Sequence, residues 1–484
     1  MSGAALANQI ADFSHLERAY ADVFEKYRAK QLSGSFDVSA ALLGGKSRDL
    51  TVSQPSHEST GEPASVIFAN TRLVLGQLSL SAGSNNQLSI VQAQSDQEQR
   101  SLTIQGGQLR FSELVSIVRA MEQQADLIGV DGFKVPIAIW ADAELVLEPN
   151  DHLRLSRSDG AFVANFGRLT VFESQISGSG SANLREPDYR PFVATAGTGI
   201  AYVKNSHLES LGFGTTAAFS GVSLLSPGLY QPSESSVIQG NTFLNSGPVS
   251  VKGARGADVS GNLFLESIGP GMVVRGGEGA QVVGNTFVAP TGGSAIRVTD
   301  GASGTYVANN LILASSAQGI EVEGAGAQTQ LLGNHIWNSA RNGISVSRSD
   351  CTYVDGNYIF SAQSRGISLS SSRGSVIKNN RIFRNQSAGI HVTNQPVGTK
   401  TRLMGNQITA NRVGLSSASA ADLLMQDNDF SEQFPRLLEG DLIFQSRQIL
   451  QDLHGKQFVT LASAGVDQFA LPELACRNTQ AQEG

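Results

Sequence analysis

The chain has 484 residues, with 52 glycines, only 14 prolines and 16% charged residues. Its formal net charge of −7 argues against a nucleic-acid partner, because neutralising phosphates requires a basic surface. No apolar run approaches the roughly 18 residues of a membrane span, so we expect no membrane insertion. The length suits one large elongated domain with appendages.

The N-terminal third predicts appendages rather than repeats. Residues 8–30 carry apolar side chains at helical spacing, which predicts an amphipathic helix that packs on or caps the rest, or binds a partner. We interpret residues 31–100 as irregular β structure and residues 108–127 as one helix. Residues 1–134 are thus assigned to an N-terminal capping region, because an uncovered solenoid end exposes strand edges.

A repeat follows and occupies the middle of the chain. An asparagine, with a bulky apolar residue two positions later, recurs at steps of 21 to 26 residues at Asn241, Asn262, Asn285, Asn310, Asn334, Asn357, Asn380, Asn406 and Asn428. Between the asparagines run short alternating strands of the form Gly-Ile-x-Val-x. This period predicts an all-β fold, a right-handed parallel β-helix over residues 135–430. Each asparagine is expected at a corner, where it tolerates a left-handed backbone and bonds within a ladder.

The pattern breaks after Phe430. Residues 435–455 predict a helix, and we assign residues 431–484 to a C-terminal helical cap and tail. Two cysteines, Cys351 and Cys476, are too few for a disulfide framework, and the sequence leaves open whether Cys351 pairs.

Outward positions of the repeated strands form columns along one face. In chain order they are Ser250 and Lys252, Val273 and Arg275, Arg297 and Thr299, Glu321 and Glu323, Ser345 and Ser347, Ser368 and Ser370, and His391 and Thr393. The columns predict a basic stripe (Lys252, Arg275 and Arg297) that leads to two carboxylates, then Arg348, then hydroxyl groups ending at His391. A polymer lying along this face would meet one ring of side chains in every coil.

Three segments carry a family resemblance: LRLSRSDGAFVANFGRLTVFESQISG (153–178), YRPFVATAGTGIAYVKNSHLESLGF (189–213) and FSGVSLLSPG (219–228). They resemble the periplasmic alginate (mannuronan) C5-epimerases, whose repeats are preceded by LRLS…GAF, RPF and SLGY-like segments. Residues 342–349, 380–392 and 405–414 are similar to that family's coils. The resemblance covers about residues 100–430 and implies a right-handed β-helix, a periplasmic location and a polyuronate substrate in a groove along one face.

The chain departs from this family at the catalytic motif. The family's run Gly-Ile-Asp-Pro-His-Asp, whose histidine is the proposed base, is absent. Aligned backward from NRIFRN, it falls on 319–324, so that Glu323 takes the place of the histidine, Glu321 that of the first aspartate, and Arg348 that of a catalytic arginine. Aligned forward from FSGVSLLSPG it falls instead on 271–276; the backward alignment has the tighter match.

The expected chemistry is proton abstraction next to a uronate carboxylate. It needs a cation on that carboxylate and a base near the carbon. We assign Glu323, Glu321 and Arg348 to catalysis, with Glu323 as the base, its pKa raised by the neighbouring Glu321. Substrate binding is assigned to Lys252, Arg275, Arg297, Ser345, Ser347 and His391, without metal or cofactor. His391 lies about three coils, or roughly 14 Å at strand spacing, from Glu323 and so outside the same site.

Other interpretations remain open at this point. The charged cluster also fits a solvated ion-pair network, and the altered motif fits a non-catalytic protein that guides the polymer among export proteins. A lyase would protonate the leaving oxygen instead of the carbon. Hydrolysis ranks low, because Glu321 and Glu323 lie on one side of a substrate rather than flanking the bond, and a Ca²⁺ site that adds Asp300 has too few oxygens.

The compartment is inferred from the resemblance. The start MSGAALANQIADF lacks the basic and apolar regions of a signal peptide, which fits either a cytoplasmic protein or one whose signal has been removed. The resemblance favours a periplasmic or secreted protein with an anionic polysaccharide as its partner.

Overall fold

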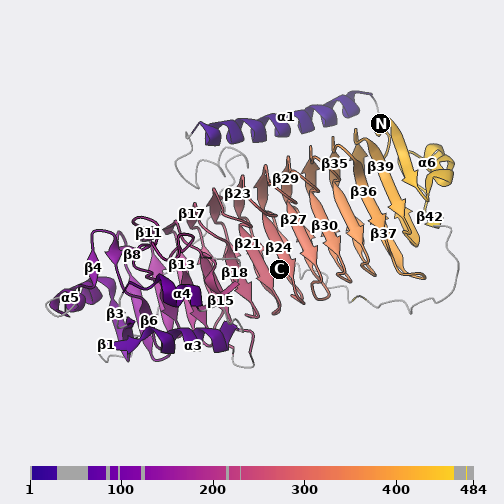
Figure 1. Ribbon diagram of the computed structural model, residues 1–484. Helices are drawn as coiled ribbons and strands as arrows, with labels where there is room; N and C mark the ends of the chain where they lie inside the picture. The colour runs from indigo at the N-terminus through magenta and orange to yellow at the C-terminus, as the bar shows by residue number, and fades with distance from the viewer. Residues whose placement is uncertain are drawn as a thin grey trace. The chain divides into compact units, whose positions relative to one another are not determined.

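The computed structural model describes residues 3–29, 64–82, 88–95, 99–121, 126–213, 217–228, 231–462 and 476. The chain forms two compact units, a first unit of Leu32–Gln281 and a second unit that combines Met1–Gln31 with Val282–Gly484. In both, successive turns of the chain add one strand to each of three sheets, here called sheets I, II and III (Figure 1). The predicted parallel β-helix is confirmed.

The first unit opens with helices and two antiparallel strand pairs and continues as parallel coils. Its helices are α3 (Thr71–Ala82), α4 (Leu88–Ala93), α5 (Phe111–Met121) and the 3₁₀ turn η1 (Ala217–Phe219). Sheet I contains β1 (Ser65–Asn70), β2 (Arg100–Gln105), β6 (Ile137–Ile139), β9 (Val163–Asn165), β12 (Val193–Ala196), β15 (Val222–Leu225), β18 (Val249–Lys252) and β21 (Met272–Arg275). Sheet II contains β3 (Gly107–Arg110), β7 (Ala143–Leu147), β10 (Arg168–Phe172), β13 (Ile200–Lys204), β16 (Val237–Gln239) and β19 (Asp258–Ser260). Sheet III contains β4 (Ile128–Gly129), β5 (Gly132–Phe133), β8 (His152–Ser156), β11 (Gln175–Ser179), β14 (His207–Glu209), β17 (Thr242–Leu244) and β20 (Leu263–Leu265).

The second unit holds the helix α1 (Gly3–Arg28) and the remaining coils; the boundary between the units falls within β22 (Gln281–Val283). Sheet I contains β24 (Ile296–Thr299), β27 (Ile320–Glu323), β30 (Ile344–Ser347), β33 (Ile367–Ser370), β36 (Ala388–Thr393), β39 (Val413–Ala418) and β41 (Arg436–Gly440). Sheet II contains β25 (Tyr306–Ala308), β28 (Gln330–Leu332), β31 (Tyr353–Asp355), β34 (Val376–Lys378), β37 (Lys400–Met404), β40 (Asp422–Gln426) and β42 (Val459–Ala462). Sheet III contains β23 (Thr286–Val288), β26 (Leu311–Leu313), β29 (His335–Trp337), β32 (Tyr358–Phe360), β35 (Arg381–Phe383) and β38 (Gln407–Thr409).

The repeated asparagines form the predicted buried ladder. The backbone N–H and the Nδ2 of Asn334 both donate to Oδ1 of Asn357, each at 2.9 Å. Asn357 repeats this toward Asn380 in the next coil, at 3.0 and 2.9 Å. At each corner, the asparagine side chain thus accepts from a backbone N–H that has no partner in the β-sheets. The ladder fixes the register from coil to coil.

The left-handed backbone lies one residue earlier than predicted. Gly333 (φ 58°), Gly356 (φ 64°) and Asn379 (φ 52°) immediately precede ladder asparagines, whereas the ladder asparagines do not have positive φ. Glycine and asparagine adopt this conformation at little cost. The recurring Gly-Asn and Asn-Asn dipeptides therefore combine two roles, the turn in the first residue and the amide ladder in the second.

Residues 31–100 contain helix where we predicted irregular β structure. Val74, Leu75 and Leu78 of α3 are buried in a cluster that also contains Phe192. Their spacing matches one face of a helix, and the exposed Leu80 obscured that face in the sequence. In addition, β2 already pairs in parallel with β6, so coil structure begins before residue 135. Residues 31–63 of the predicted region lie outside the described residues.

Helix α1 corresponds to the helix predicted over residues 8–30 and lies along the outward face of sheet III in the second unit (Figure 1). Tyr20, only 1% exposed, packs on the rings of His335 and Phe360 at centroid distances of 6.1 and 6.2 Å. Its hydroxyl also hydrogen-bonds to Nδ1 of His335. Farther along the helix, Phe24 packs on Trp337 at 5.7 Å. The helix therefore covers the side of the coils.

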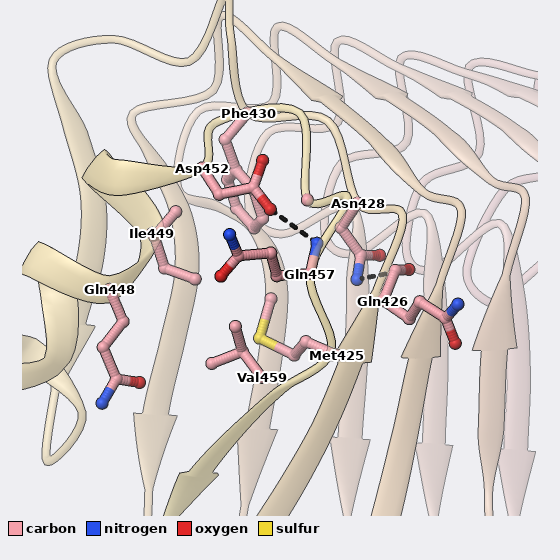
Figure 2. Close-up of a pocket in the computed structure, with 10 residues that line it drawn as sticks. Met425, Gln426, Asn428, Phe430, Gln448, Ile449, Asp452, Gln457 and Val459 are labelled. Carbon is pink, nitrogen blue, oxygen red and sulfur yellow. Dashed lines mark hydrogen bonds between the residues drawn. The ribbon is translucent and has the colours of Figure 1, made fainter.

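The C-terminal segment closes the stack of the second unit with less helix than predicted. Residues 436–440 form β41, which pairs in parallel with β39 because Leu438 stacks on Leu415 in the core. Helix is limited to α6 (Ser446–Gln451) after the 3₁₀ turn η2 (Ile443–Gln445). Strand β42 pairs antiparallel with β40. Figure 2 shows the narrow crevice between this cap and the last coil, where the Gln457 N–H donates to Asp452 at 2.6 Å.

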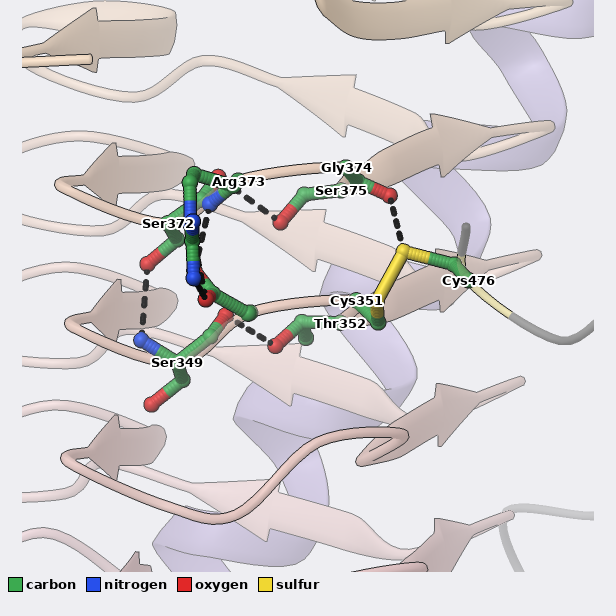
Figure 3. Close-up of a disulfide and its surroundings, with 9 residues drawn as sticks. Ser349, Cys351, Thr352, Ser372, Arg373, Gly374, Ser375 and Cys476 are labelled. Carbon is green, nitrogen blue, oxygen red and sulfur yellow. Dashed lines mark hydrogen bonds and ion pairs between the residues drawn. A yellow bond between two sulfur atoms is a disulfide. The ribbon is translucent and has the colours of Figure 1, made fainter. Parts of the chain in front are cut away.

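The two cysteines form a disulfide, which answers the pairing question that the sequence left open. Cys351, at a corner between sheets I and II, is bonded to Cys476 with a Cα–Cα distance of 5.5 Å (Figure 3). The neighbouring corner is held by Arg373, which donates to Asp350 through Nε at 2.9 Å and Nη2 at 2.6 Å. The bond links Cys476 to the middle of the second unit, 125 residues away in sequence.

Candidate functional site

The predicted catalytic residues lie at two adjacent strands of sheet I in the second unit: Glu321 and Glu323 belong to β27, and Arg348 directly follows β30. Arg297 of β24 stands opposite Glu321 of β27, and Thr299 stands opposite Glu323. Because the flanking Ile and Val side chains point into the core and are at most 1% exposed, these polar side chains point outward. The stacked coils thus bring them onto one face, as the column argument predicted.

A chain of ion pairs joins these side chains. Nη2 of Arg297 lies 3.1 Å from Oε2 of Glu323, and its Nε lies 3.5 Å from Oε2 of Glu321. Nη2 of Arg348 lies 2.6 Å from Oε1 of Glu323. We call Arg297, Glu321, Glu323 and Arg348 the charged cluster. Guanidinium groups therefore contact both oxygens of Glu323. The assignment of Glu323 as the base relied on repulsion between its carboxylate and that of Glu321, and Arg297, which contacts both carboxylates, offsets this repulsion.

The charged cluster is accessible from solvent. The side chains of Glu321, Glu323 and Arg297 retain 22%, 34% and 35% of their exposure, and Arg348 retains 64%. At such exposure an added anionic group can compete for a guanidinium, because a surface ion pair contributes at most about 1 kcal/mol. The arrangement can bind a carboxylate by exchanging partners.

Two polar residues of this site were missed in the sequence. The Ser294 hydroxyl donates to Oε2 of Glu321 at 2.8 Å and lies 3.1 Å from Oε1 of Gln318. Both residues precede their strands at the corner between sheets III and I, outside the alternating pattern. The one signal in the sequence is that each of them lies two residues before the strand in successive coils.

The other predicted binding residues are distributed over both units. Lys252 and Arg275 stand opposite each other on β18 and β21 of the first unit. In the second unit, Ser345 and Ser347 stand opposite Glu321 and Glu323 and so directly follow the charged cluster. His391 stands farther along the same sheet, opposite Ser368 and Ser416. The structure therefore groups Ser345 and Ser347 with the catalytic candidates and places His391 elsewhere.

His391 is half-buried in polar surroundings. Its Nδ1 lies 2.6 Å from the Ser416 hydroxyl. Burial, followed by the positive charge of Arg365, lowers the pKa of His391 to about 4, although Asp441 and Glu439 act in the opposite direction. The imidazole is therefore neutral at pH 7.

Neither a metal cluster nor a membrane helix is found in the described part of the chain. No three His, Cys, Asp or Glu side chains come together there as a metal site would require. No helix among the described residues is long and apolar enough to cross a membrane.

Family comparisons cover the coils of both units. The family described as "Right handed beta helix region" matches residues 153–336, and the family described as "Periplasmic copper-binding protein (NosD)" matches residues 290–436. The first match confirms the predicted hand of the helix.

Curated relatives match a shorter part of the chain. A mannuronan C5-epimerase of Pseudomonas aeruginosa is 29% identical over 156 residues, 30% of this chain and 28% of that protein. The mannuronan C5-epimerase AlgG of Azotobacter vinelandii is 30% identical over 128 residues, 25% of this chain and 24% of that protein. The chain thus matches about a quarter of the length of these relatives.

Solved structures extend the likeness in fold. The crystal structure of the periplasmic alginate epimerase AlgG is 18% identical, with a TM-score of 0.60, over 82% of this chain and 96% of that one. A double mutant of the same epimerase gives a TM-score of 0.62 at 16% identity over the same shares. The chain is thus similar in sequence to mannuronan C5-epimerases over about a quarter to a third of its length, and it shares the right-handed β-helix fold of the alginate epimerase AlgG.

Proposed function

We propose that the protein is a C5-epimerase-like enzyme that acts in the periplasm on a uronate-containing polysaccharide such as alginate. The observation that carries this proposal is the charged cluster on an accessible face of sheet I, in a relative of mannuronan C5-epimerases. The disulfide supports the compartment, because such bonds persist in oxidising environments such as the periplasm.

The proposed reaction begins with an exchange of ion pairs. The uronate carboxylate takes Arg297 or Arg348 from Glu323, which frees a carboxylate oxygen of Glu323 beside the sugar. Glu323 then removes the C5 proton, and the electron pair moves into the substrate carboxylate as an enolate that the guanidinium stabilises. Since Glu321 and Glu323 project from one strand, the returning proton comes from the opposite, solvent side and inverts C5.

Proton NMR of polymannuronate incubated with the protein in heavy water tests this proposal. Epimerisation gives guluronate signals with deuterium at C5, as expected. Unsaturated chain ends would identify a lyase instead, since the same enolate then expels the glycosidic oxygen. An unchanged polymer that still binds would overturn the enzymatic proposal.

The second candidate is a non-catalytic protein that binds and guides the polymer among exopolysaccharide export proteins. Two observations favour it: residues 319–324 lack the Asp-Pro-His-Asp run, and both oxygens of Glu323 are engaged by arginines. In that case the charged cluster is a binding surface or an ion-pair network. The protein then binds polymannuronate, but the NMR spectrum of the polymer stays unchanged.

A further inference from the structure

A second polar group lies on sheet I of the second unit, beyond the charged cluster. Ser368, His391 and Ser416 stand in register on β33, β36 and β39. Arg365 lies two residues before β33, and its positive charge acts on His391. We call Arg365, Ser368, His391 and Ser416 the histidine cluster. His391 was predicted to bind substrate, whereas Arg365 was not among the predicted residues.

Arg365 differs from the arginines of the charged cluster in lacking a carboxylate partner. Arg297 and Arg348 form ion pairs at 2.6 to 3.5 Å. Among the described residues, the half-buried Arg365 side chain forms none, and burial lowers the pKa of its guanidinium. A half-buried cation without a counter-charge is unfavourable, because it loses hydration without compensation. An anion supplied from outside would remove this cost.

The rest of the histidine cluster offers neutral donors beside that cation. Ser368 and Ser416 are 7% and 8% exposed, so their hydroxyls are almost buried. When the Ser416 hydroxyl donates to Nδ1 of His391, the neutral imidazole carries its proton on Nε2 and presents it outward. The acidic groups nearby are themselves engaged: Asp441 accepts from the Ser419 N–H at 2.7 Å and from the Ser417 hydroxyl, and Glu439 pairs with Arg436 at 3.2 Å.

We propose that the histidine cluster is a second carboxylate-binding subsite for an acidic saccharide, in which Arg365 pairs with a uronate carboxylate and His391 donates to the same sugar. This subsite rests on the proposed function, because a polymer lying along sheet I would pass from the charged cluster to the histidine cluster. With neighbouring coils about 4.8 Å apart, the two clusters contact sugars that are several residues apart in one chain. Chains long enough to span both clusters therefore bind more tightly than short ones.

Titration calorimetry with a mannuronate hexamer tests the subsite. In Arg365→Gln the Kd rises about tenfold or more, the usual loss for a hydrogen bond to a charged group, and Arg365→Lys recovers part of that loss. His391→Phe, which keeps a ring but no donor, weakens binding several-fold. Arg341→Gln, which removes an exposed arginine from the preceding coil, is the control and leaves Kd unchanged.

Several outcomes would overturn the subsite. An unchanged Kd in Arg365→Gln with an intact circular dichroism spectrum would do so, as would an equal loss in Arg341→Gln, since that is a nonspecific charge effect. Equal binding of a neutral mannose hexamer would exclude carboxylate recognition. The two proposals can fail separately. If binding depends on Arg365 but no deuterium appears at C5, the subsite stands and the epimerase proposal fails. If the protein epimerises the polymer but Arg365→Gln leaves KM unchanged, the epimerase proposal stands and the subsite fails.

Discussion

Nη2 of Arg348 lies 2.6 Å from Oε1 of Glu323 across two adjacent coils. This contact makes Glu323 the centre of the charged cluster, because its other oxygen is held by Arg297 at 3.1 Å. A base in this position is available only after substrate has drawn one arginine away. Catalysis, if Glu323 carries it, is therefore coupled to binding of a carboxylate.

Glu323→Gln is expected to abolish deuterium incorporation at C5 while the protein still binds polymannuronate. The glutamine cannot accept the proton, but both arginines remain for the substrate carboxylate. Stability changes little, because exposed ion pairs contribute about 0–1 kcal/mol. Glu439→Gln, which breaks the exposed pair with Arg436 at 3.2 Å on the same sheet, is the control and keeps full turnover. Full turnover in Glu323→Gln would remove the assignment of the base.

Asn357→Ala is expected to lower the free energy of unfolding by about 3 kcal/mol, because it leaves buried donors of Asn334 without an acceptor. It also removes the Nδ2 bond to the Leu331 carbonyl at 2.8 Å. Asn379→Gly is the matched control: its φ of 52° is one that glycine adopts freely, and glycine already occupies the equivalent corner at 356. Thermal unfolding measures both. Equal melting temperatures would mean that the asparagine ladder does not stabilise the coils.

Periodicity alone was sufficient to predict the coils and the placement of Arg297, Glu321 and Glu323 on one face. A repeat that places isoleucine on isoleucine also dictates which side chains point outward. The ladder of asparagines was predicted for the same reason. The residue with positive φ lies one position before the predicted one, because the Gly-Asn or Asn-Asn dipeptide does not show which of its two residues adopts the left-handed conformation.

Features that depend on contacts between distant segments could not be predicted in this way. The Cys351–Cys476 bond joins residues 125 positions apart, and nothing in their local sequence indicates the pairing. Helix α1 was predicted, but its docking on sheet III was not, because the contact of Tyr20 with His335 joins residues 315 positions apart. Arg365 escaped notice because it lies at a corner, outside the alternating strand pattern.

Reduction of the disulfide, or Cys476→Ser, is expected to destabilise the protein by about 2–4 kcal/mol, since the bond closes a long loop in the unfolded chain. Cys476 is then no longer bonded to the corner that also contains Asp350 and Arg373. Melting temperatures with and without reductant measure the effect, and the Cys476→Ser variant should no longer respond to reductant. Two maleimide-reactive thiols in the native, unreduced protein would contradict the bond.

Acidification is expected to weaken the docking of α1 through His335. Burial, followed by the charge of Arg381, lowers the pKa of His335 to about 4, against about 6.5 in an unfolded chain. Between these values the undocked state binds more protons, so docking is strongest above pH 6.5 and is lost as the pH falls toward 4. Trp337, which contacts Phe24 of α1, reports the change in a Trp140→Phe background, where it is the sole tryptophan. Its emission should shift to the red on acidification, and His335→Phe, which retains a ring against Tyr358, should flatten that shift. An identical shift in His335→Phe would show that another group governs the docking of α1.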